Sequence, residues 1–320
     1  MRMSDVPHIV STDSFTDRNC TARLFRAATT FRNHGMQKIL PQRLKGRILA
    51  TVFYEPSTRT RFSFEAAMLK LGGQVITTES AGHFSSAIKG ETLEDTIRIV
   101  AGYADAIVLR HPEIGAAARA AAVSSVPVIN AGDGAGEHPT QALLDLYTIR
   151  QELGRLDDFT IAMAGDLRYG RTVHSLIRLL GSRRGVRVVL ASPAGLRLPK
   201  EYRLFLQERK IPFRETEAFE TALQSADVLY MTRVQKERVP ARERGHARKS
   251  AFVLHSAHMS LLPRHAVIMH PLPRAGEIDP AVDADPRAAY FRQAENGLYI
   301  RMALLLEVMG CALQGNVRKQ

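Results

Sequence analysis

Cysteine is nearly absent from this sequence, which limits the cross-links and metal sites that it can form. Cys20 and Cys311 are the two cysteines, and neither belongs to a Cys-x-x-Cys pair. A disulfide framework or a cysteine zinc site needs more thiols at closer spacing. The histidines near residues 255–265 also lack acidic neighbours at ligand spacing. The sequence therefore predicts no metal site, and its cysteine content favours a reducing compartment.

Tryptophan and long apolar runs are also absent. The most apolar stretch, 302–313, contains Glu307 and is shorter than the roughly 20 residues of a membrane-spanning helix. The N-terminal region carries Asp5, Asp13 and Asp17 and lacks the apolar core of a signal peptide. We therefore expect a cytoplasmic protein with no membrane-bound segment.

Acidic residues are fewer than basic ones. The 32 Asp and Glu residues stand against 44 Lys and Arg residues, a formal net charge of +12. Such an excess is one mark of nucleic-acid-binding proteins. Here it is spread along the chain, and basic patches interleaved with stacking aromatic residues are not evident. We therefore expect a basic surface with sites for small anions, and no nucleic-acid partner.

What the sequence does contain is a repeated alternation of strand and helix patterns. Short apolar runs ending at polar turns alternate with segments whose apolar residues recur at helical spacing. The 320 residues, 45% of them hydrophobic, are enough for two domains. The prediction is an α/β protein with two doubly wound parallel-sheet domains and an interdomain active-site cleft. The predicted domains are 1–150 and 151–294, with a C-terminal helix, 295–320, packing back on the first.

The individual elements are predicted from these patterns. Strands are expected at 47–53, 74–78, 106–109, 126–129, 159–164, 186–190, 228–231, 252–254 and 266–269. Helices are expected at 16–33, 62–69, 93–103, 142–151, 172–180, 199–209, 217–225 and 295–313.

The stretch from Phe53 to Glu65, FYEPSTRTRFSFE, joins the first strand to a helix and indicates an anion site. Pro56 stands where the strand must stop, and Ser57 and Thr58 stand where the helix begins. The first backbone N–H groups of a helix have no partner within it, so hydroxyl and arginine side chains beside them favour a phosphate. The alternative is an ordinary capped helix with solvated arginines.

Two further strand ends carry polar side chains toward the same sheet edge. Arg110 follows the apolar run 106–109, and His138 precedes Pro139 at a helix start, after the glycine-rich stretch 130–137. Ligands of open α/β sheets bind at the carboxyl ends of the strands. A lone histidine is more often structural, but its convergence with arginines from other strand ends favours one common site.

In the second half of the sequence, three further turns follow the carboxyl ends of predicted strands. The turn 165–171 follows a predicted strand but lacks the glycine pattern of a dinucleotide site. The strand 228–231 runs into TRVQKER and then a basic loop, 236–249, interpreted either as a mobile lid or as a solvated connection. In HPLPR, 270–274, two prolines fix the backbone and leave carbonyl groups available to a ligand amine.

These motifs resemble those of the aspartate carbamoyltransferases, and the resemblance covers nearly the whole chain. STRTR at 57–61 and HPTQ at 138–141 match the two motifs that all carbamoyltransferases share. RVQKER at 233–238 and HPLPR at 270–274 are similar to the aspartate-specific motifs, whereas ornithine enzymes carry His-Cys-Leu-Pro at the second. Ala275-Gly276 departs from the family, which usually has a bulkier residue followed by an acidic or amide residue.

The resemblance implies transfer of a carbamoyl group from carbamoyl phosphate to aspartate in pyrimidine biosynthesis, without a cofactor. The implied carbamoyl-phosphate ligands are Ser57, Thr58, Arg59, Thr60, Ser85, Lys89, Arg110, His138 and Gln141. The implied aspartate ligands are Lys89, Arg171, Arg233, Gln235, Leu272 and Pro273, the last two through their carbonyl groups. The implied catalytic residues are Arg59, Thr60, His138 and Lys89.

The resemblance also implies a homotrimer with shared active sites, in which Ser85 and Lys89 belong to the neighbouring chain's site. It leaves open whether regulatory chains or a dihydroorotase bind. The chemistry agrees with this assignment, because attack by an amine on carbamoyl phosphate builds an oxyanion that converging cations and hydroxyl groups stabilise. Phosphate is itself a good leaving group, so no nucleophilic side chain is required.

Two other functions are weighed against this one. A carbamoyltransferase for ornithine or an acylated ornithine would need an acidic or polar pocket, whereas Arg171 and Arg233 suit a dicarboxylate. From another class, the chain would be an inactive homologue serving as an assembly subunit, or a basic protein that binds polyanions. Such subunits are expected to lose motif residues, and none is missing here.

Overall fold

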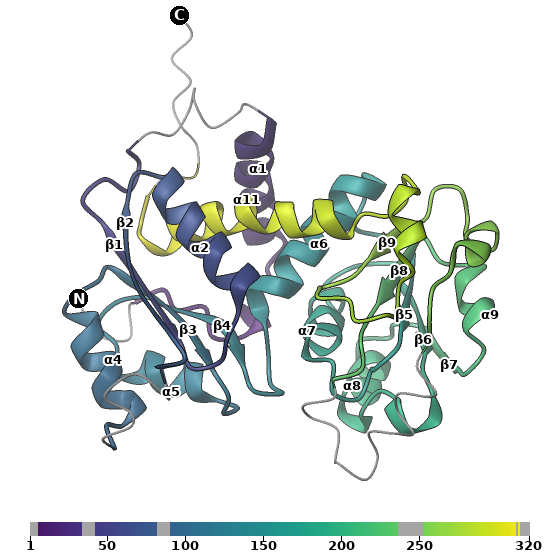
Figure 1. Cartoon of the computed structure of the whole chain (residues 1–320), viewed down its shortest axis with the longest axis horizontal. Coiled ribbons are helices and arrows are strands. Elements are labelled where there is room, and N and C mark those ends of the chain that lie inside the picture. The colour runs from purple at the N-terminus through teal and green to yellow at the C-terminus, as the bar shows by residue number, and fades with distance from the viewer. Residues whose placement is uncertain (1–5, 34–41, 82–89, 236–251, 312, 314–320) are drawn as a thin grey trace, which may run out of the picture. The chain divides into compact units, whose positions relative to one another are not determined.

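The computed structural model describes residues 6–33, 42–81, 90–235, 252–311 and 313. The chain forms two compact units, residues 1–143 with 295–320 and residues 144–294. Each unit contains one parallel sheet flanked by helices, which confirms the predicted α/β class (Figure 1). Two helices, α6 (Pro139–Leu153) and α11 (Tyr290–Val308), contribute residues to both units.

The first unit is built on a four-stranded sheet with the order β2-β1-β3-β4. Its strands are β1 (Ile48–Phe53), β2 (Gln74–Glu79), β3 (Ala106–His111) and β4 (Val128–Asp133). Its other elements are η2 (Thr12–Phe15), α1 (Arg18–Asn33), α2 (Thr58–Lys70), α4 (Leu93–Ala101) and α5 (Ala116–Val123). The chain adds β2 on one side of β1 and then β3 on the other side, so the strand order reverses between β1 and β3.

Side chains alternate across β1 between two packed layers. Ala50 and Val52 belong to the apolar core that α4 and α5 cover. Thr51 lies on the opposite face, where its hydroxyl oxygen is 3.0 Å from Glu65 Oε1 of α2 and 2.8 Å from Thr77 Oγ1 of β2. A strand buried on both faces needs apolar residues at nearly every position, which is why β1 is apolar except for Thr51.

A segment near the N-terminus pairs with the outer edge of β4. The Ile9 N–H donates to the Val128 carbonyl, and the Asn130 N–H donates to the Ile9 carbonyl, both at 2.8 Å. The Asn130 side chain donates to the Val10 carbonyl and accepts from the Gly132 N–H. These bonds keep 130–133 extended, so β4 ends at Asp133 and the predicted strand end at 129 is wrong.

The second unit is built on a five-stranded parallel sheet with the order β7-β6-β5-β8-β9. Its strands are β5 (Thr160–Ala164), β6 (Arg187–Ala191), β7 (Phe213–Thr216), β8 (Val228–Met231) and β9 (Val267–Met269). Its helices are α7 (Arg171–Leu180), η4 (Ala194–Leu196), α8 (Lys200–Glu208), α9 (Phe219–Leu223), η6 (Ser256–Ser260) and η7 (Pro280–Ala284). The strand order reverses between β5 and β8.

One element of this half was missed, and two element predictions are wrong. The strand β7 was not predicted, because three of the four residues of its sequence FRET are polar and it lies at a sheet edge where no continuous apolar run is needed. The segment 252–254 forms only an isolated bridge between Leu254 and Ile278. The last helix starts at Tyr290, five residues before the predicted start at 295.

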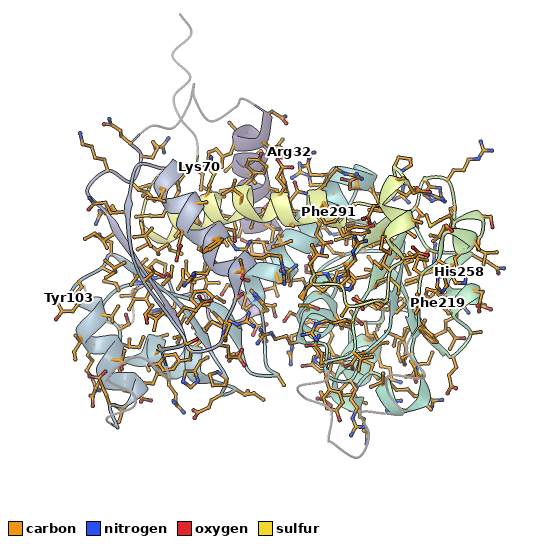
Figure 2. The ribbon with its side chains drawn as sticks, viewed as in Figure 1. Arg32, Lys70, Tyr103, Phe219, His258 and Phe291 are labelled. Atoms are coloured by element: carbon orange, nitrogen blue, oxygen red, sulfur yellow. The ribbon has the colours of Figure 1, made fainter. Side chains whose placement is uncertain are left out.

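The apolar character of 252–254 has another cause. The ring of Phe252 stacks on Phe219 of α9 with 5.1 Å between centroids. Phe219 also meets His258 edge-on at 5.5 Å, and both of these residues are labelled in Figure 2. Phe252 therefore packs against the core beside α9 without belonging to the sheet. Apolar residues that cover a sheet and those that form it give the same short sequence pattern.

Candidate functional site

Several of the predicted site residues lie at the points where the strand order of each sheet reverses. In the first unit, α2 follows β1, and Arg110 of β3 is in register with Phe53, the last residue of β1. In the second unit, Arg171 begins α7 after β5, and Arg233 follows β8. Loops beside such a reversal diverge to opposite faces of the sheet and leave a crevice at the carboxyl ends of the strands. Each unit therefore has its own candidate anion site.

Ser57 and Arg110 are brought together at the first of these points. Ser57 is the residue before α2, but its hydroxyl caps no helix N–H. It accepts instead a hydrogen bond from Arg110 Nη1 at 3.4 Å. Arg110 Nε is also 3.4 Å from Glu55 Oε2, and the Ser57 N–H donates to Glu79 Oε1 at 3.3 Å. The turn after β1 and the end of β3 thus present a hydroxyl and a guanidinium side by side.

The two arginines of the STRTR motif have different surroundings. Arg59 is exposed, whereas Arg61 Nη1 forms an ion pair with Glu79 Oε2 at 3.0 Å and its Nε is 3.7 Å from Glu65 Oε1. Glu65 also accepts from Thr77 Oγ1 at 2.8 Å. Arg61 therefore neutralises two carboxylates that fix the turn. Arg59 is the arginine of this motif that is exposed to solvent.

The glycine-rich stretch presents His138 at the start of α6. The Asp133 carboxylate accepts from the backbone N–H groups of Gly115 and Glu137, each at 2.9 Å. The His138 carbonyl accepts from the N–H groups of Gln141 and Ala142, which closes the first turn of α6. His138 and Gln141 are 4% and 9% exposed. A buried carboxylate thus braces the loop that places these two side chains.

Asp166 connects the two turns of the second unit. It is fully buried, its Oδ1 accepts from the N–H groups of Arg168 and Tyr169 at 3.1 and 2.9 Å, and its Oδ2 accepts from the Gln235 N–H at 2.9 Å. The turn after β5 is therefore tied to the turn after β8 by one side chain. A charged acceptor makes stronger hydrogen bonds than a neutral one, so this connection is firm.

The approach of these turns also needs a glycine. Gly165 has a φ of +116°, and a Cβ there would come within 2.3 Å of the Thr232 carbonyl oxygen. The Thr232 N–H donates to the Ala164 carbonyl at 2.8 Å across the same gap. Any side chain at Gly165 would separate the two turns. The positive φ of this residue is unfavourable for residues with a side chain, and the Thr232 carbonyl group occupies the place of a Cβ.

Arg171 and Arg233 stand on these two turns. Arg171 is the first residue of α7 and only 6% exposed. Arg233 is half-buried, and its Nη2 is 3.4 Å from Gln235 Oε1. His174 lies one helical turn after Arg171. Its Nε2 is 2.8 Å from the Leu167 carbonyl oxygen, and its imidazole stacks on the ring of Tyr202. The structure therefore brings Arg233 and Gln235 together, as the predicted aspartate site requires, and places Arg171 within the second unit.

The HPLPR segment closes into a small ring. Leu272 has a φ of +51°, which is uncommon for a residue with a side chain. Its N–H donates to His270 Nδ1 at 2.8 Å, and His270 Nε2 lies 2.7 Å from Glu277 Oε1. The Glu277 carboxylate also accepts from the Ala275 N–H at 2.9 Å. The departure from the family at Ala275-Gly276 thus lies inside a closed loop.

Burial and hydrogen bonds determine where the proton lies between His270 and Glu277. Burial lowers the pKa of His270 although Glu277 opposes the shift, so the imidazole is neutral. Since Nδ1 accepts from Leu272, the proton is on Nε2 and is donated to Glu277. The hydrogen bond from His270 and the Ala275 N–H together outweigh burial and lower the pKa of Glu277. A neutral imidazole and a carboxylate therefore hold the segment that contains Leu272 and Pro273.

Several positioning residues were not predicted from the sequence. They are the acidic residues Glu79, Asp133, Asp166 and Glu277, each of which accepts backbone N–H groups beside a predicted ligand. A carboxylate one or two residues after a predicted strand, as in AGD at 164–166, is the signal that would have identified Asp166. The predicted residues Ser85 and Lys89, and the basic loop 236–249, lie outside the described residues.

Two general findings concern the described residues alone. No group of three or more His, Cys, Asp or Glu side chains is placed there to hold a metal ion. In the same residues, no helix has the length and apolar character needed to cross a membrane.

The fold and the two candidate anion sites describe an α/β protein with two parallel-sheet units, each with cationic groups at its strand-order reversal. Comparison with known families specifies the class. Residues 7–151 match the model of the aspartate/ornithine carbamoyltransferase carbamoyl-P binding domain, and residues 157–308 match the Asp/Orn binding domain. The chain belongs to the aspartate/ornithine carbamoyltransferase family.

Individual relatives are named for the aspartate reaction. Aspartate carbamoyltransferase 3, chloroplastic, of Pisum sativum is 51% identical over 290 residues, which cover 90% of this chain and 74% of that protein. The catalytic subunit of M. jannaschii aspartate transcarbamoylase superposes with a TM-score of 0.87 at 46% identity, covering 95% of this chain and 98% of that one. The Trypanosoma cruzi enzyme in complex with N-(phosphonacetyl)-L-aspartic acid gives a TM-score of 0.86 at 42% identity, covering 93% and 94%.

Proposed function

We propose that this protein transfers the carbamoyl group of carbamoyl phosphate to the α-amino group of L-aspartate, giving N-carbamoyl-L-aspartate and phosphate, an early step of pyrimidine biosynthesis. The observation that carries the choice of acceptor is the pair Arg171 and Arg233 beside the strand-order reversal of the second unit. Two guanidinium groups match the two carboxylates of aspartate. The names of the relatives support the same acceptor.

We assign the first unit to carbamoyl phosphate. Its phosphate is bound by the hydroxyl groups and N–H groups at the start of α2, by Arg59 and by Arg110, which already contacts Ser57. Helix N-termini favour anions through their unpaired N–H groups and their dipole. The remaining ligands in this assignment are Thr58, Thr60, His138 and Gln141. Residues 1–150 with the C-terminal helix are the corresponding domain.

We assign the second unit, which contains the predicted domain 151–294, to aspartate. Arg171 and Arg233 bind its carboxylates, and Gln235, held through its N–H by Asp166, assists Arg233. The carbonyl groups of Leu272 and Pro273 orient the amine. The ring from His270 to Glu277 supports this role, since it fixes the backbone on which those carbonyl groups lie.

The proposed reaction is one of positioning and charge stabilisation. The aspartate nitrogen forms a bond to the carbamoyl carbon, the bond from that carbon to the phosphate oxygen breaks, and the phosphate leaves with the proton that the amine loses. Arg59, Thr60 and His138 donate to the carbonyl oxygen as negative charge develops on it. Such donors are worth about 3–4 kcal/mol each in comparable sites, and correct orientation can contribute about 7–11 kcal/mol.

We further propose a cytoplasmic homotrimer in which Ser85 and Lys89 complete the site of the neighbouring chain. One observation supports a subunit interface on the first unit. Phe62 and Leu69 of α2 are 53% and 61% exposed. Since they are seven residues apart, about two turns, they lie on one side of α2 and are suited to a shared apolar contact. Light scattering of the purified protein tests the trimer.

The reaction is tested by measuring phosphate release from carbamoyl phosphate with either aspartate or ornithine as acceptor. We expect release only with aspartate, and we expect Arg233→Ala to raise the KM for aspartate more than tenfold. Turnover of ornithine in place of aspartate would show that the acceptor assignment is wrong. Absence of turnover with both, in a protein that binds carbamoyl phosphate, would favour an inactive assembly subunit.

A further inference from the structure

A basic pocket lies in the second unit at the sheet edge opposite Arg171 and Arg233. It has a volume of about 480 Å³ and is lined by the segments 183–187 and 209–212. The segment 183–187 leads into β6 and includes its first residue, and 209–212 directly precedes β7, so the pocket is at the amino ends of these strands. The proposed aspartate ligands follow strands at their carboxyl ends. Since the five residues of β6 span roughly 16 Å, the two places are separate.

The lining of this pocket is cationic. Its nine lining residues include five cations, namely Arg183, Arg184, Arg187, Arg209 and Lys210, and no acidic residue. Two aspartates flank it. Asp157 accepts a hydrogen bond from the Arg184 N–H at 2.9 Å, and Asp158 lies against Gly185. Five positive charges against two flanking carboxylates leave an excess of positive charge in a small volume.

Four cations of the pocket differ from Arg197 and Arg203, two surface arginines elsewhere in the same unit. Arg197 pairs with Glu217 at 2.7 Å, and Arg203 pairs with Glu215 at 3.2 Å. Within the described residues, Arg184, Arg187, Arg209 and Lys210 make no ion pair at all. Arg187 Nε donates to Thr160 Oγ1 at 3.2 Å, and Arg209 lies over the Phe205 ring at 5.5 Å. Like charges that outnumber their counter-charges repel, and an anion would relieve that repulsion.

The shape of the pocket indicates the size and chemistry of the anion. Its volume lies within the range of small-molecule sites, about 300–1,000 Å³, and its floor contains the buried side chains of Val186 and Ile211. Arginine recognises phosphate through two parallel N–H donors, and several arginines around one cavity suit several phosphate groups. We propose that this pocket binds a small anion with two or more linked phosphate groups, either inorganic polyphosphate or the phosphate chain of a nucleotide.

The proposal is tested by calorimetric titration of the full-length protein with pyrophosphate, tripolyphosphate and ATP at about 150 mM salt, where weak surface attraction is screened. The test variant is Arg184→Ala/Arg209→Ala. The matched control is Arg197→Ala/Arg203→Ala, which removes the same charge from the same unit outside the pocket. A third variant, Arg59→Ala, weakens the proposed carbamoyl-phosphate site, and thermal melting verifies that every variant is folded.

We expect one tripolyphosphate per chain to bind the control and the Arg59→Ala variant as it binds the unaltered protein. We expect Arg184→Ala/Arg209→Ala to lose at least tenfold in affinity. Equal affinities for ATP and tripolyphosphate identify the phosphate chain as the ligand. A tenfold higher affinity for ATP shows that the nucleoside also contacts the apolar floor of the pocket. The proposal is overturned if none of the three anions binds, if the control loses as much affinity as the pocket variant, or if Arg59→Ala removes all binding.

Discussion

The carboxylate of Asp166 accepts a hydrogen bond from the backbone N–H of Gln235 at 2.9 Å, across the strand-order reversal between β5 and β8. The same carboxylate holds the N–H groups of Arg168 and Tyr169 through its other oxygen. One buried side chain therefore sets the distance between the turn that leads to Arg171 and the turn that carries Arg233. Asp166 is a positioning residue for the proposed aspartate site.

Replacing Asp166 by asparagine is expected to impair the use of aspartate. If the amide oxygen takes the place of Oδ1 and keeps two N–H groups, its NH2 group meets the Gln235 N–H, and two donors face one another. The lost hydrogen bond and the unpaired donor cost about 1–3 kcal/mol, so we expect the KM for aspartate to rise about tenfold or more while the KM for carbamoyl phosphate stays within twofold. Steady-state kinetics with each substrate measure this.

The matched control is Asp157→Asn, because Asp157 also caps a loop N–H of this unit, at the other edge of the sheet. We expect its kinetics to resemble those of the unaltered protein. An Asp166→Asn protein with an unchanged KM for aspartate would contradict the positioning role.

The two arginines of the STRTR motif are expected to differ in what their removal changes. Arg59→Ala should raise the KM for carbamoyl phosphate about 10- to 100-fold and lower the free energy of unfolding by less than about 1 kcal/mol, because contacts of an exposed arginine are screened by solvent. Arg61→Ala leaves Glu79 and Glu65 without their cation, so its free energy of unfolding should fall by about 1–2 kcal/mol, allowing for partial solvent screening. Urea titrations and phosphate-release assays of both variants measure the contrast. Similar melting behaviour of the two would contradict it.

The ring from His270 to Glu277 makes stability depend on pH. Burial lowers the pKa of His270 from 6.5. Below about pH 6.5, His270 of the unfolded chain therefore binds a proton that His270 of the folded protein does not. Stability should therefore be fully present above that pH and fall as the pH is lowered, by at most about 1.4 kcal/mol per pH unit for this group. The lowered pKa of Glu277 acts in the same direction below 4.5.

Urea titrations between pH 7.5 and about pH 5 measure this slope. In His270→Asn the amide can still accept from Leu272 but does not titrate, so the slope should be smaller than in the unaltered protein. A residual slope is expected because burial also lowers the pKa values of His8 and His111. An unchanged slope in His270→Asn would show that this histidine does not contribute.

Most of the fold could be predicted because β1, β3, β5 and β8 are buried on both faces and read as short apolar runs. The edge strand β7 was missed for the opposite reason, since its partly exposed side chains include charged ones. Ligand residues were found through motifs with unusual chemistry, such as STRTR. The supporting carboxylates were not, because an acidic residue that caps a turn looks in the sequence like any solvated one.

The shared site of the proposed trimer gives the last prediction. If Lys89 completes the site of the neighbouring chain, Arg59→Ala and Lys89→Ala damage opposite halves of one site, and each variant alone should be nearly inactive. A closed ring that contains both variants has one junction where an intact Arg59 meets an intact Lys89. Random 1:1 mixing makes about three quarters of the trimers hybrid, each with one active site in three, so activity should return to about a quarter of that of the unaltered enzyme. The subunits are dissociated, mixed and reassembled, and the hybrids are separated by a charge tag before phosphate release is assayed. Hybrids no more active than their parents would place Lys89 in its own chain's site or in none.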